Sequence, residues 1–195
     1  MADLVETSAL AQKDEAMADG SATIDLSLSE LREITGYAVA CARPALAIFE
    51  RDRPDDRRPR AAIEAAQAFA DGAERAKALR DNAWAAHRAA QETRDAGQAA
   101  ASDAARAAAH ACGAAFLHPL AKATQVKHIL GSAAHAARAF ELAAGDDPAV
   151  GAGHIAQSRI LASLVVVDVL RRYPAAPPGG GRTGELTRQL DASLR

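Results

Sequence analysis

An all-α fold is the class that this sequence predicts, and its composition carries the prediction. Of the 195 residues, 49% are hydrophobic, only 4% are aromatic, and 53 are alanine. Alanine is the best helix former and a poor strand residue, which disfavours an all-β fold or a doubly wound α/β fold. Small alanine faces also let helices pack closely. We therefore predict an alanine-rich bundle of five to six helices, mostly antiparallel, over residues 27–173.

The first helix of the bundle is expected to begin after Ser27. The Ser27 hydroxyl and the Glu30 carboxylate have the spacing of a capping box, in which each side chain accepts from the other's backbone N–H. The preceding residues 1–26 are polar and are expected to form a flexible arm. Apolar residues then recur every three or four positions over 31–48, which indicates one helix face. Pro44 removes a backbone hydrogen bond, so this helix is expected to kink or restart there.

Three further helices are predicted between the charged connector 51–60 and residue 117. Pro59 suits the first turn of a helix, whereas Gly72 and Gly97 suit positions at which helices end. The last of the three is almost pure alanine on every face. The predicted bounds are about 59–72, 73–94 and 98–117.

Proline and glycine positions also define the last two predicted helices. Pro119 is interpreted as the first residue of a helix over about 119–144. The segment Gly145-Asp146-Asp147-Pro148 combines a helix stop, a cap and a helix start. A sixth helix is therefore expected to begin there or after Gly153, and to end near Tyr173.

Large side chains are few, so each is expected to anchor a layer of the core. Beyond the bundle, residues 174–195 are expected to form a Pro/Gly linker followed by a short polar tail. The anchors are Phe49, Phe69, Trp84, Phe116 and Phe140. For Trp84 the alternative is an exposed rim, where Arg80 and Arg88, each four residues away, would form cation–π contacts with the indole.

Charge and composition disfavour several classes of partner. The formal net charge of −2 and the pI near 6.3 provide no general attraction for nucleic acid or an anionic membrane, so neither is expected as a partner. No apolar run approaches the roughly 20 residues of a membrane span. Two cysteines, Cys41 and Cys112, do not suggest a secreted disulfide framework. We expect a cytoplasmic protein, and the sequence leaves its oligomeric state open.

Five of the six histidines lie between residues 87 and 135. On one helix, the pairs His110/His118 and His128/His135 would lie about 10–12 Å apart at 1.5 Å per residue, too far to bind one metal ion alone. A helical hairpin turning near residue 123 would instead place His110 opposite His135 and His118 opposite His128. A helix starting at Pro119 argues against that register. We expect no cofactor, and a metal ion held by His118 and His128 is the disfavoured alternative.

The segment 116–130 is the densest polar cluster. Gln125 and His128 are three residues apart and share a helix face, and His118 lies near the expected helix start. Such groups either bind a polar ligand or satisfy free backbone N–H groups at the helix start. With Trp84 and His87, they make up a candidate ligand pocket, in which a histidine would serve as a general base or a metal ligand. No nucleophilic triad, phosphate loop or dinucleotide-binding motif accompanies them, so we lean against an enzyme.

The connector is the second polar cluster, and it contains Asp55, Asp56, Arg57 and Arg60. Asp residues ahead of a helix cap it, and Arg60 is four residues from Glu64, the spacing of a helical ion pair. The same charges form a candidate surface for a protein partner.

Several sequence blocks resemble a known family. These are Pro54-Asp55-Asp56, Arg58-Pro59-Arg60 and Ala62-Ile63-Glu64-Ala65, followed by the blocks FLHPLA, ATQV and HILG, within residues 31–144. Together they resemble the Imm-5-like family of bacterial immunity proteins associated with polymorphic toxin systems. The resemblance implies a small helical protein that binds and neutralises a cognate toxin. The alternative is a small-ligand-binding protein or enzyme that uses the His/Gln-lined pocket.

Overall fold

The computed structural model describes residues 22–195, so the expected arm over residues 1–26 lies almost entirely outside the described residues. The all-α prediction is confirmed: these residues form helices and loops, with no strand beyond one isolated bridge. There are more helices than the five to six expected, because two predicted helices are divided and one was missed. The elements are α2 (Leu28–Ala42), η1 (Arg43–Ala45), α3 (Leu46–Asp52), α4 (Arg58–Ala70), α5 (Lys77–Asp95), α6 (Ala99–Ala114), η2 (Ala123–Gln125), α7 (Val126–Ala143), α8 (Pro148–Leu161), α9 (Leu164–Arg171) and α10 (Gly181–Leu194).

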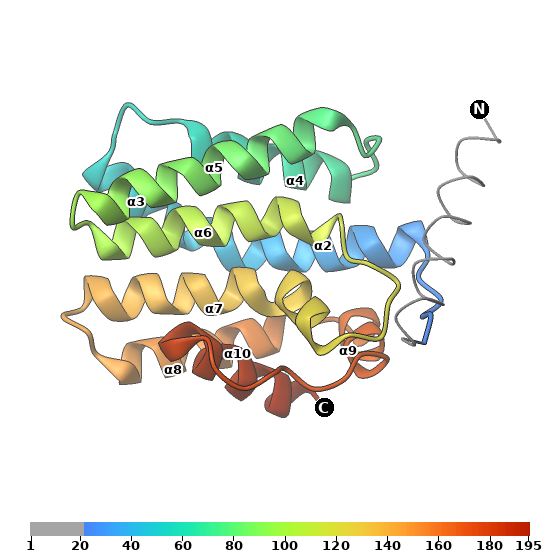
Figure 1. Cartoon of the computed structure of the whole chain (residues 1–195). Helices are drawn as coiled ribbons and strands as arrows, with labels where there is room; N and C mark the ends of the chain where they lie inside the picture. Colours follow the sequence, from blue (N-terminus) through green and yellow to red (C-terminus); the bar gives the residue numbers. More distant parts are fainter. Residues whose placement is uncertain (1–21) are drawn as a thin grey trace.

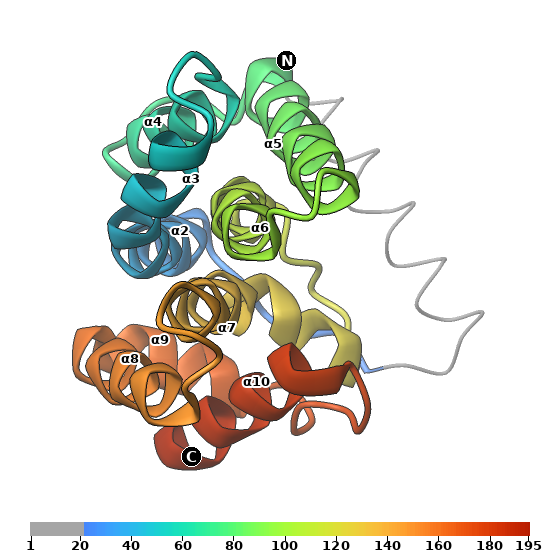
Figure 2. The ribbon, with the colours of Figure 1, turned by 90° about the vertical axis from the view of Figure 1, so that its left-hand side faces the viewer.

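Helices α6 and α7 lie side by side at the centre of the molecule (Figures 1 and 2). Helices α4 and α5 pack against α6, while α8 and α10 pack against α7. Helix α2 contacts both central helices and extends the core toward α9. The C-terminal helices therefore cover one side of the central pair, and the helices before α6 cover the other side.

The central position of α6 follows from its alanine content. A helix that is apolar on every face is buried on every face, and ten of the sixteen residues of α6 are buried. Hydroxyl groups at its interfaces form hydrogen bonds between helices. Ser102 donates to the Ala90 carbonyl at 2.7 Å, and Ser132 of α7 donates to the Ala107 carbonyl at 2.6 Å. Small side chains and satisfied hydroxyls thus let three helices meet closely.

Helix boundaries in the first half follow the caps and breakers in the sequence. The capping box is confirmed: the Ser27 hydroxyl accepts from the Glu30 N–H at 3.2 Å, and the Glu30 carboxylate accepts from the Ser27 N–H at 2.7 Å. Pro44 lies in η1, after which the helix restarts as α3. Gly72 and Gly97 have φ of 119° and 76°, and each follows the end of a helix as predicted.

The predicted helix start at Pro119 is wrong. Residues 118–122 form an irregular segment, because their backbone groups pair with residues 22–24 instead of with a helical turn. The Ile24 N–H donates to the Pro119 carbonyl at 2.8 Å, and the Ala121 N–H donates to the Ala22 carbonyl at 2.9 Å. The helix begins only at Val126, after the short turn η2.

The stop and start predicted at 145–148 is confirmed. Gly145 has φ of 79° after α7, and Pro148 is the first residue of α8. The Asp147 carboxylate accepts from the Ala149 N–H at 2.9 Å and so caps the new helix.

A single sixth helix reaching Tyr173 is wrong. Ala162 leaves the helical conformation, and the Ser163 hydroxyl caps a new helix by accepting from the Val166 N–H at 3.4 Å. Among residues 22–195, no single helix is long and apolar enough to cross a membrane. Helices α8 and α9 pass that test only as a pair, and the pair is bent by 101°.

The expectation of a polar tail at the C-terminus is also wrong. Helix α10 packs against α7 and α8, with Leu186 and Leu190 fully buried. Three successive glycines, 179–181, have positive φ and turn the chain into this helix. Gly184 is required by close approach, since a Cβ there would lie 2.0 Å from the Gly179 carbonyl oxygen. The leucine spacing is helical, but the tail's polar composition concealed it.

The expected aromatic anchors divide into two groups. Phe49 and Phe69 are fully buried, as predicted, whereas Phe116 and Phe140 are only partly buried. Trp84 is 59% exposed, so its assignment to the core is wrong. The buried residues of α5 are small, apart from one leucine, and the indole lies on the other side of that helix.

Candidate functional site

The connector between α3 and α4 is held in place by a surface charge cluster. The Asp56 carboxylate accepts from the Arg58 backbone N–H at 3.1 Å and from its guanidinium at 2.7–3.1 Å. The same guanidinium also donates to Glu92 of α5. The hydrogen bonds from Arg58 lower the pKa of Asp56. Asp56 therefore holds the connector to the first turn of α4.

The other three predicted partner contacts have different environments. Arg60 donates twice to Glu50 of α3, at 2.6 Å, so the predicted helical pair with Glu64 is wrong. The long Arg60 side chain reaches the preceding helix, which crosses nearby. Asp55 and Arg57 are exposed, and their side chains form no hydrogen bond or ion pair with the described residues. The connector thus presents two uncommitted charges on a fixed backbone.

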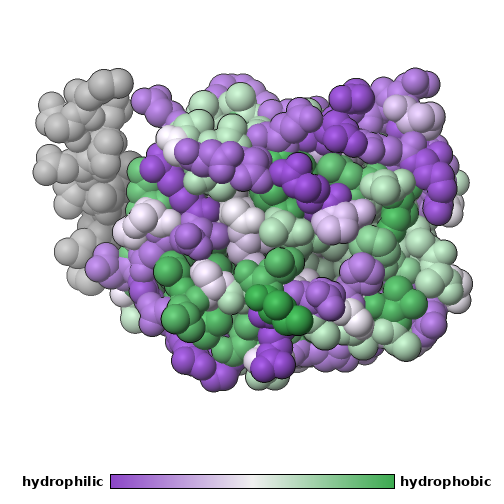
Figure 3. Space-filling model, turned by 180° about the vertical axis from the view of Figure 1, so that it is seen from behind, coloured by the Kyte–Doolittle hydropathy of each residue, from purple (hydrophilic) through white to green (hydrophobic). Residues whose placement is uncertain are grey.

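A second surface, which we name the apolar corner, lies where α8 meets α9. Hydrophobic atoms gather over this part of the molecule in the view from behind (Figure 3). The segment has the composition of a buried helix, and the sequence alone gave no sign that it bends outward. Contiguous exposed apolar patches commonly mark interaction sites. The residues are Ile160 (75% exposed), Leu161 (50%), Leu164 (88%) and Val165 (38%).

The predicted His/Gln pocket is only partly assembled. Trp84, His118 and His128 line one cavity of about 770 Å³. Gln125 is used structurally, since its side-chain oxygen accepts from the His118 backbone N–H at 3.1 Å. His87 does not line the cavity but contacts the Trp84 ring edge-on, at 6.1 Å between centroids. The structure therefore brings three of the five predicted residues together.

Cationic side chains border this cavity, and metal ligands do not gather there. Arg75 and Arg80 both lie over the Phe116 ring, with the Arg80 guanidinium 4.9 Å from the ring centre. The His128 Nδ1 is 3.0 Å from the Gly113 carbonyl oxygen. Within residues 22–195, no group of three or more His, Cys, Asp or Glu side chains could hold a metal ion.

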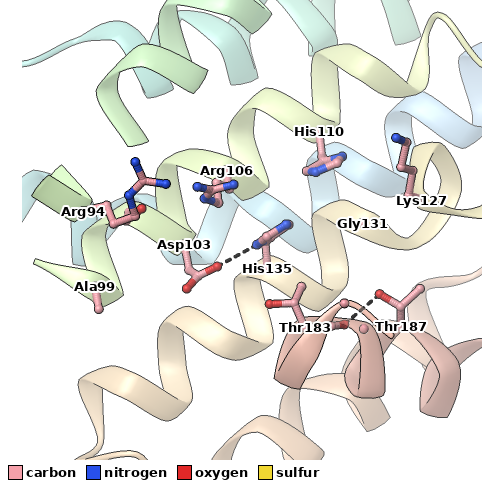
Figure 4. A pocket seen from close by; sticks show the side chains of 13 residues that line it. Arg94, Ala99, Asp103, Arg106, His110, Lys127, Gly131, His135, Thr183 and Thr187 are labelled. Carbon is pink, nitrogen blue, oxygen red and sulfur yellow. Dashed lines mark hydrogen bonds and ion pairs between the residues drawn. The ribbon is translucent and has the colours of Figure 1, made fainter. Parts of the chain in front are cut away.

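A third site, absent from the sequence predictions, lies between α6, α7 and the first turns of α10 (Figure 4). The His135 Nδ1 is 2.6 Å from the Asp103 carboxylate, and the His110 ring stacks on His135 with centroids 5.0 Å apart. His110 and His135 thus face each other across the hairpin. This is the arrangement expected for a turn near residue 123, and a helix beginning at Pro119 would have prevented it. We name the cavity between α6, α7 and α10 the α10 cavity, and its volume is about 480 Å³.

Local sequence explains how His110 reaches this position. Gly131 of α7 lies beneath the ring, and a Cβ at that position would stand 2.9 Å from the His110 Nδ1. Burial is the main cause that lowers the pKa of His110 well below its ordinary value, with neighbouring His135 adding to the effect. His110 is therefore neutral at pH 7.

The fold and these surfaces define a class: an all-helical protein with a charged connector, an apolar corner and two cavities. The chain matches the model of the Imm-5 like putative immunity protein family over residues 25–161. It therefore belongs to this family, and membership implies a partner toxin in general terms. The comparisons found no match among curated proteins or solved structures. Helices α9 and α10 lie beyond the matched residues, so the α10 cavity combines family residues with residues outside the match.

Proposed function

We propose that this protein is an immunity protein that neutralises a cognate bacterial toxin by direct protein–protein contact. Family membership supports the toxin as the partner. The free, buried cysteines Cys41 and Cys112 fit the reducing bacterial cytoplasm as the compartment of action. No step of this proposal requires catalysis by the immunity protein.

The connector is the surface we assign to the toxin. Asp56 and Arg60 hold its backbone through ion pairs with Arg58 and Glu50, respectively. Asp55 and Arg57 then extend from a fixed loop without partners among the described residues. A preorganised loop loses little conformational entropy on binding, and uncommitted charges supply specificity and fast association. These two uncommitted charges on a fixed loop are the observation that carries the proposal.

Co-expression with the toxin encoded beside this gene tests the assignment. The double charge reversal Asp55→Lys with Arg57→Glu is expected to abolish rescue of growth while leaving the helical content and the unfolding midpoint unchanged. Glu74→Lys is the control, because Glu74 is exposed and forms no side-chain pair with the described residues. Full rescue by the double variant would reject the connector. If Leu164→Asp abolished rescue and the double variant did not, the toxin contact would instead be assigned to the apolar corner. Absence of rescue by the wild-type chain would reject the toxin proposal itself.

A second candidate function is a small-ligand site in the cavity lined by Trp84, His118 and His128. The convergence of an indole and two imidazoles on one cavity favours it. Trp84 is the only tryptophan, so its fluorescence reports on this cavity alone. A saturable change in emission with a metabolite extract, lost in His118→Ala, would support it. An unchanged spectrum would reject it.

A further inference from the structure

The α10 cavity is lined by three cationic side chains, and among the described residues only one of them, Arg94, has a carboxylate partner, Asp95. Arg106 is half-buried, and its guanidinium forms no hydrogen bond or ion pair with the described residues. Lys127 also lines the cavity without such a partner. The cavity's single carboxylate, Asp103, is already engaged by His135. Partial burial of a guanidinium without a partner is unfavourable because the charge loses hydration. Hydrogen bonds to a bound anion would offset this loss.

The two imidazoles add ring nitrogens that are free to form hydrogen bonds with a ligand in the cavity. His135 directs Nδ1 to Asp103, which leaves its Nε2 for other contacts. His110 stacks on it and forms no hydrogen bond with the described residues through either ring nitrogen. Figure 4 shows Arg106, His110 and His135 on the side of the central helices that α10 covers. Side chains from two helices therefore converge on one space.

The third wall is the first two turns of α10. Gly180, the residue that precedes this helix, has no side chain to accept from the first-turn N–H groups. Thr183 and Thr187 are one turn apart and line the cavity together with Gly184. A helix start of this kind carries partial positive charge and attracts anions. Its position here is fixed by the ion pair between Arg182 and the buried Glu141.

We propose that the α10 cavity binds a small molecule that carries a phosphate group, with Arg106 and Lys127 as its cationic contacts. A phosphate has several acceptor oxygens, and these match donors that approach from α6, α7 and α10. A metal ion fits poorly because three cationic side chains, those of Arg94, Arg106 and Lys127, and one engaged carboxylate line the space. The volume of about 480 Å³ lies within the usual range for small-molecule sites.

Calorimetric and NMR titrations of the full chain test this proposal. The probes are inorganic phosphate and glycerol 3-phosphate, in buffers of matched ionic strength, and the readout is the histidine side-chain ¹H–¹⁵N spectrum. We expect saturable shifts at His110 and His135, with tighter binding of the organic phosphate if the cavity takes more than the anion. Arg106→Gln should weaken binding by about tenfold or more, since a charged hydrogen bond is lost.

The matched control is Arg159→Gln. Arg159 is an exposed arginine of α8 outside the cavity whose side chain also lacks a partner among the described residues. This variant should bind both probes like the wild type. Arg106→Gln breaks no ion pair within the described part of the chain, so its fold should be retained, and its unfolding midpoint verifies this. Lys127→Gln provides a second variant at an exposed position. The proposal is overturned if neither probe causes saturable shifts at millimolar concentrations, or if Arg106→Gln and Arg159→Gln weaken binding equally. The proposal does not depend on toxin binding.

Discussion

Two clusters of arginine and carboxylate side chains in this protein share their chemistry and differ in burial. In the first, the Glu141 carboxylate of α7 is fully buried and binds Arg138 at 2.9 Å and Arg182 of α10 at 2.5 Å. In the second, Arg58 binds Asp56 and Glu92 at the connector, where the three side chains are 32%, 19% and 58% exposed. One cluster joins helices inside the molecule, and the other fastens a surface loop.

The difference shows that burial, not the number of ion pairs, decides what such a cluster stabilises. Burial alone would raise the pKa of Glu141, but hydrogen bonds from Arg182 and Arg138 outweigh it and keep the pKa below its ordinary value. The carboxylate is thus charged at neutral pH and depends on both arginines. Losing one partner of a buried pair leaves an uncompensated charge, whereas water replaces a lost partner at the surface. Glu141 therefore fixes α10, while the connector cluster adjusts one loop.

The strongest test of this contrast is Glu141→Ala. We expect the free energy of unfolding to fall by about 3 kcal/mol, because two arginines lose their shared carboxylate and a buried space opens. Urea denaturation measures the loss. The same variant should weaken phosphate binding in the α10 cavity, since α10 is no longer fixed. A loss no greater than that of Arg58→Gln would contradict the contrast.

Gly151→Ala sharpens the same point from the neighbouring helix. A Cβ at Gly151 would lie 2.1 Å from the Glu141 carboxylate oxygen, which the arginines hold in place. Overpacking of this kind should cost about 2 kcal/mol. Gly153→Ala is the control in the same helix: a Cβ there meets nothing within 4 Å, so we expect stabilisation of about 0.5–1 kcal/mol. If both substitutions shifted the urea midpoint in the same direction, this account would be refuted.

Glu30 belongs to a third cluster, which is about as exposed as the connector cluster, and it tests the contrast through pH. A hydrogen bond from the Ser27 backbone and another from Arg172 lower the pKa of Glu30 from 4.5 to about 2. Because the folded-state pKa is the lower one, the carboxylate stabilises the native state above pH 4.5. That contribution disappears as the pH falls toward 2. Glu30→Gln should cost about 1 kcal/mol at pH 7. The difference from wild type should shrink below pH 4.5, as urea titrations at several pH values would show; a constant difference would contradict it.

The smallest effect is expected for Arg58→Gln at the connector. Exposed ion pairs contribute about 0–1 kcal/mol, so the free energy of unfolding should change by less than about 1 kcal/mol. Added salt should reduce even this difference, because it screens exposed charges. Rescue from the toxin should be weakened more than stability, since the loop that carries Asp55 and Arg57 is loosened. A loss of stability comparable to that of Glu141→Ala would erase the contrast between the clusters.

Local signals predicted local features well. The capping box at Ser27, the restart at Pro44 and the glycine breaks at Gly72 and Gly97 depend on neighbouring residues only, and each is confirmed. The helix start predicted at Pro119 was wrong because the backbone of this segment forms hydrogen bonds with residues far away in sequence. The core prediction for Trp84 was wrong because an apolar side chain does not by itself indicate which face of its helix packs against other helices.

The candidate sites were less accessible to sequence reasoning. Asp55 and Arg57 could be singled out by charge, but the pairing of Arg60 with Glu50 could not, because it depends on how α3 and α4 meet. The α10 cavity was missed altogether, since four of its thirteen lining residues come from a segment whose composition is typical of a polar tail. Its one visible signal was the symmetric spacing of His110 and His135.

By itself, the sequence determined an alanine-rich all-helical protein, most of its helix boundaries and its family, because propensity, capping and motif blocks are properties of short stretches. Tertiary structure alone decided that the last residues form a packed helix and that Ile160 and Leu164 face outward. It also decided that the Arg106 side chain lines a cavity without a partner among residues 22–195. The physical reason is that burial and pairing depend on which surfaces meet. Where most faces are alanine, many helix pairings look alike in sequence, and a few contacts such as that between Glu141 and Arg182 select one of them.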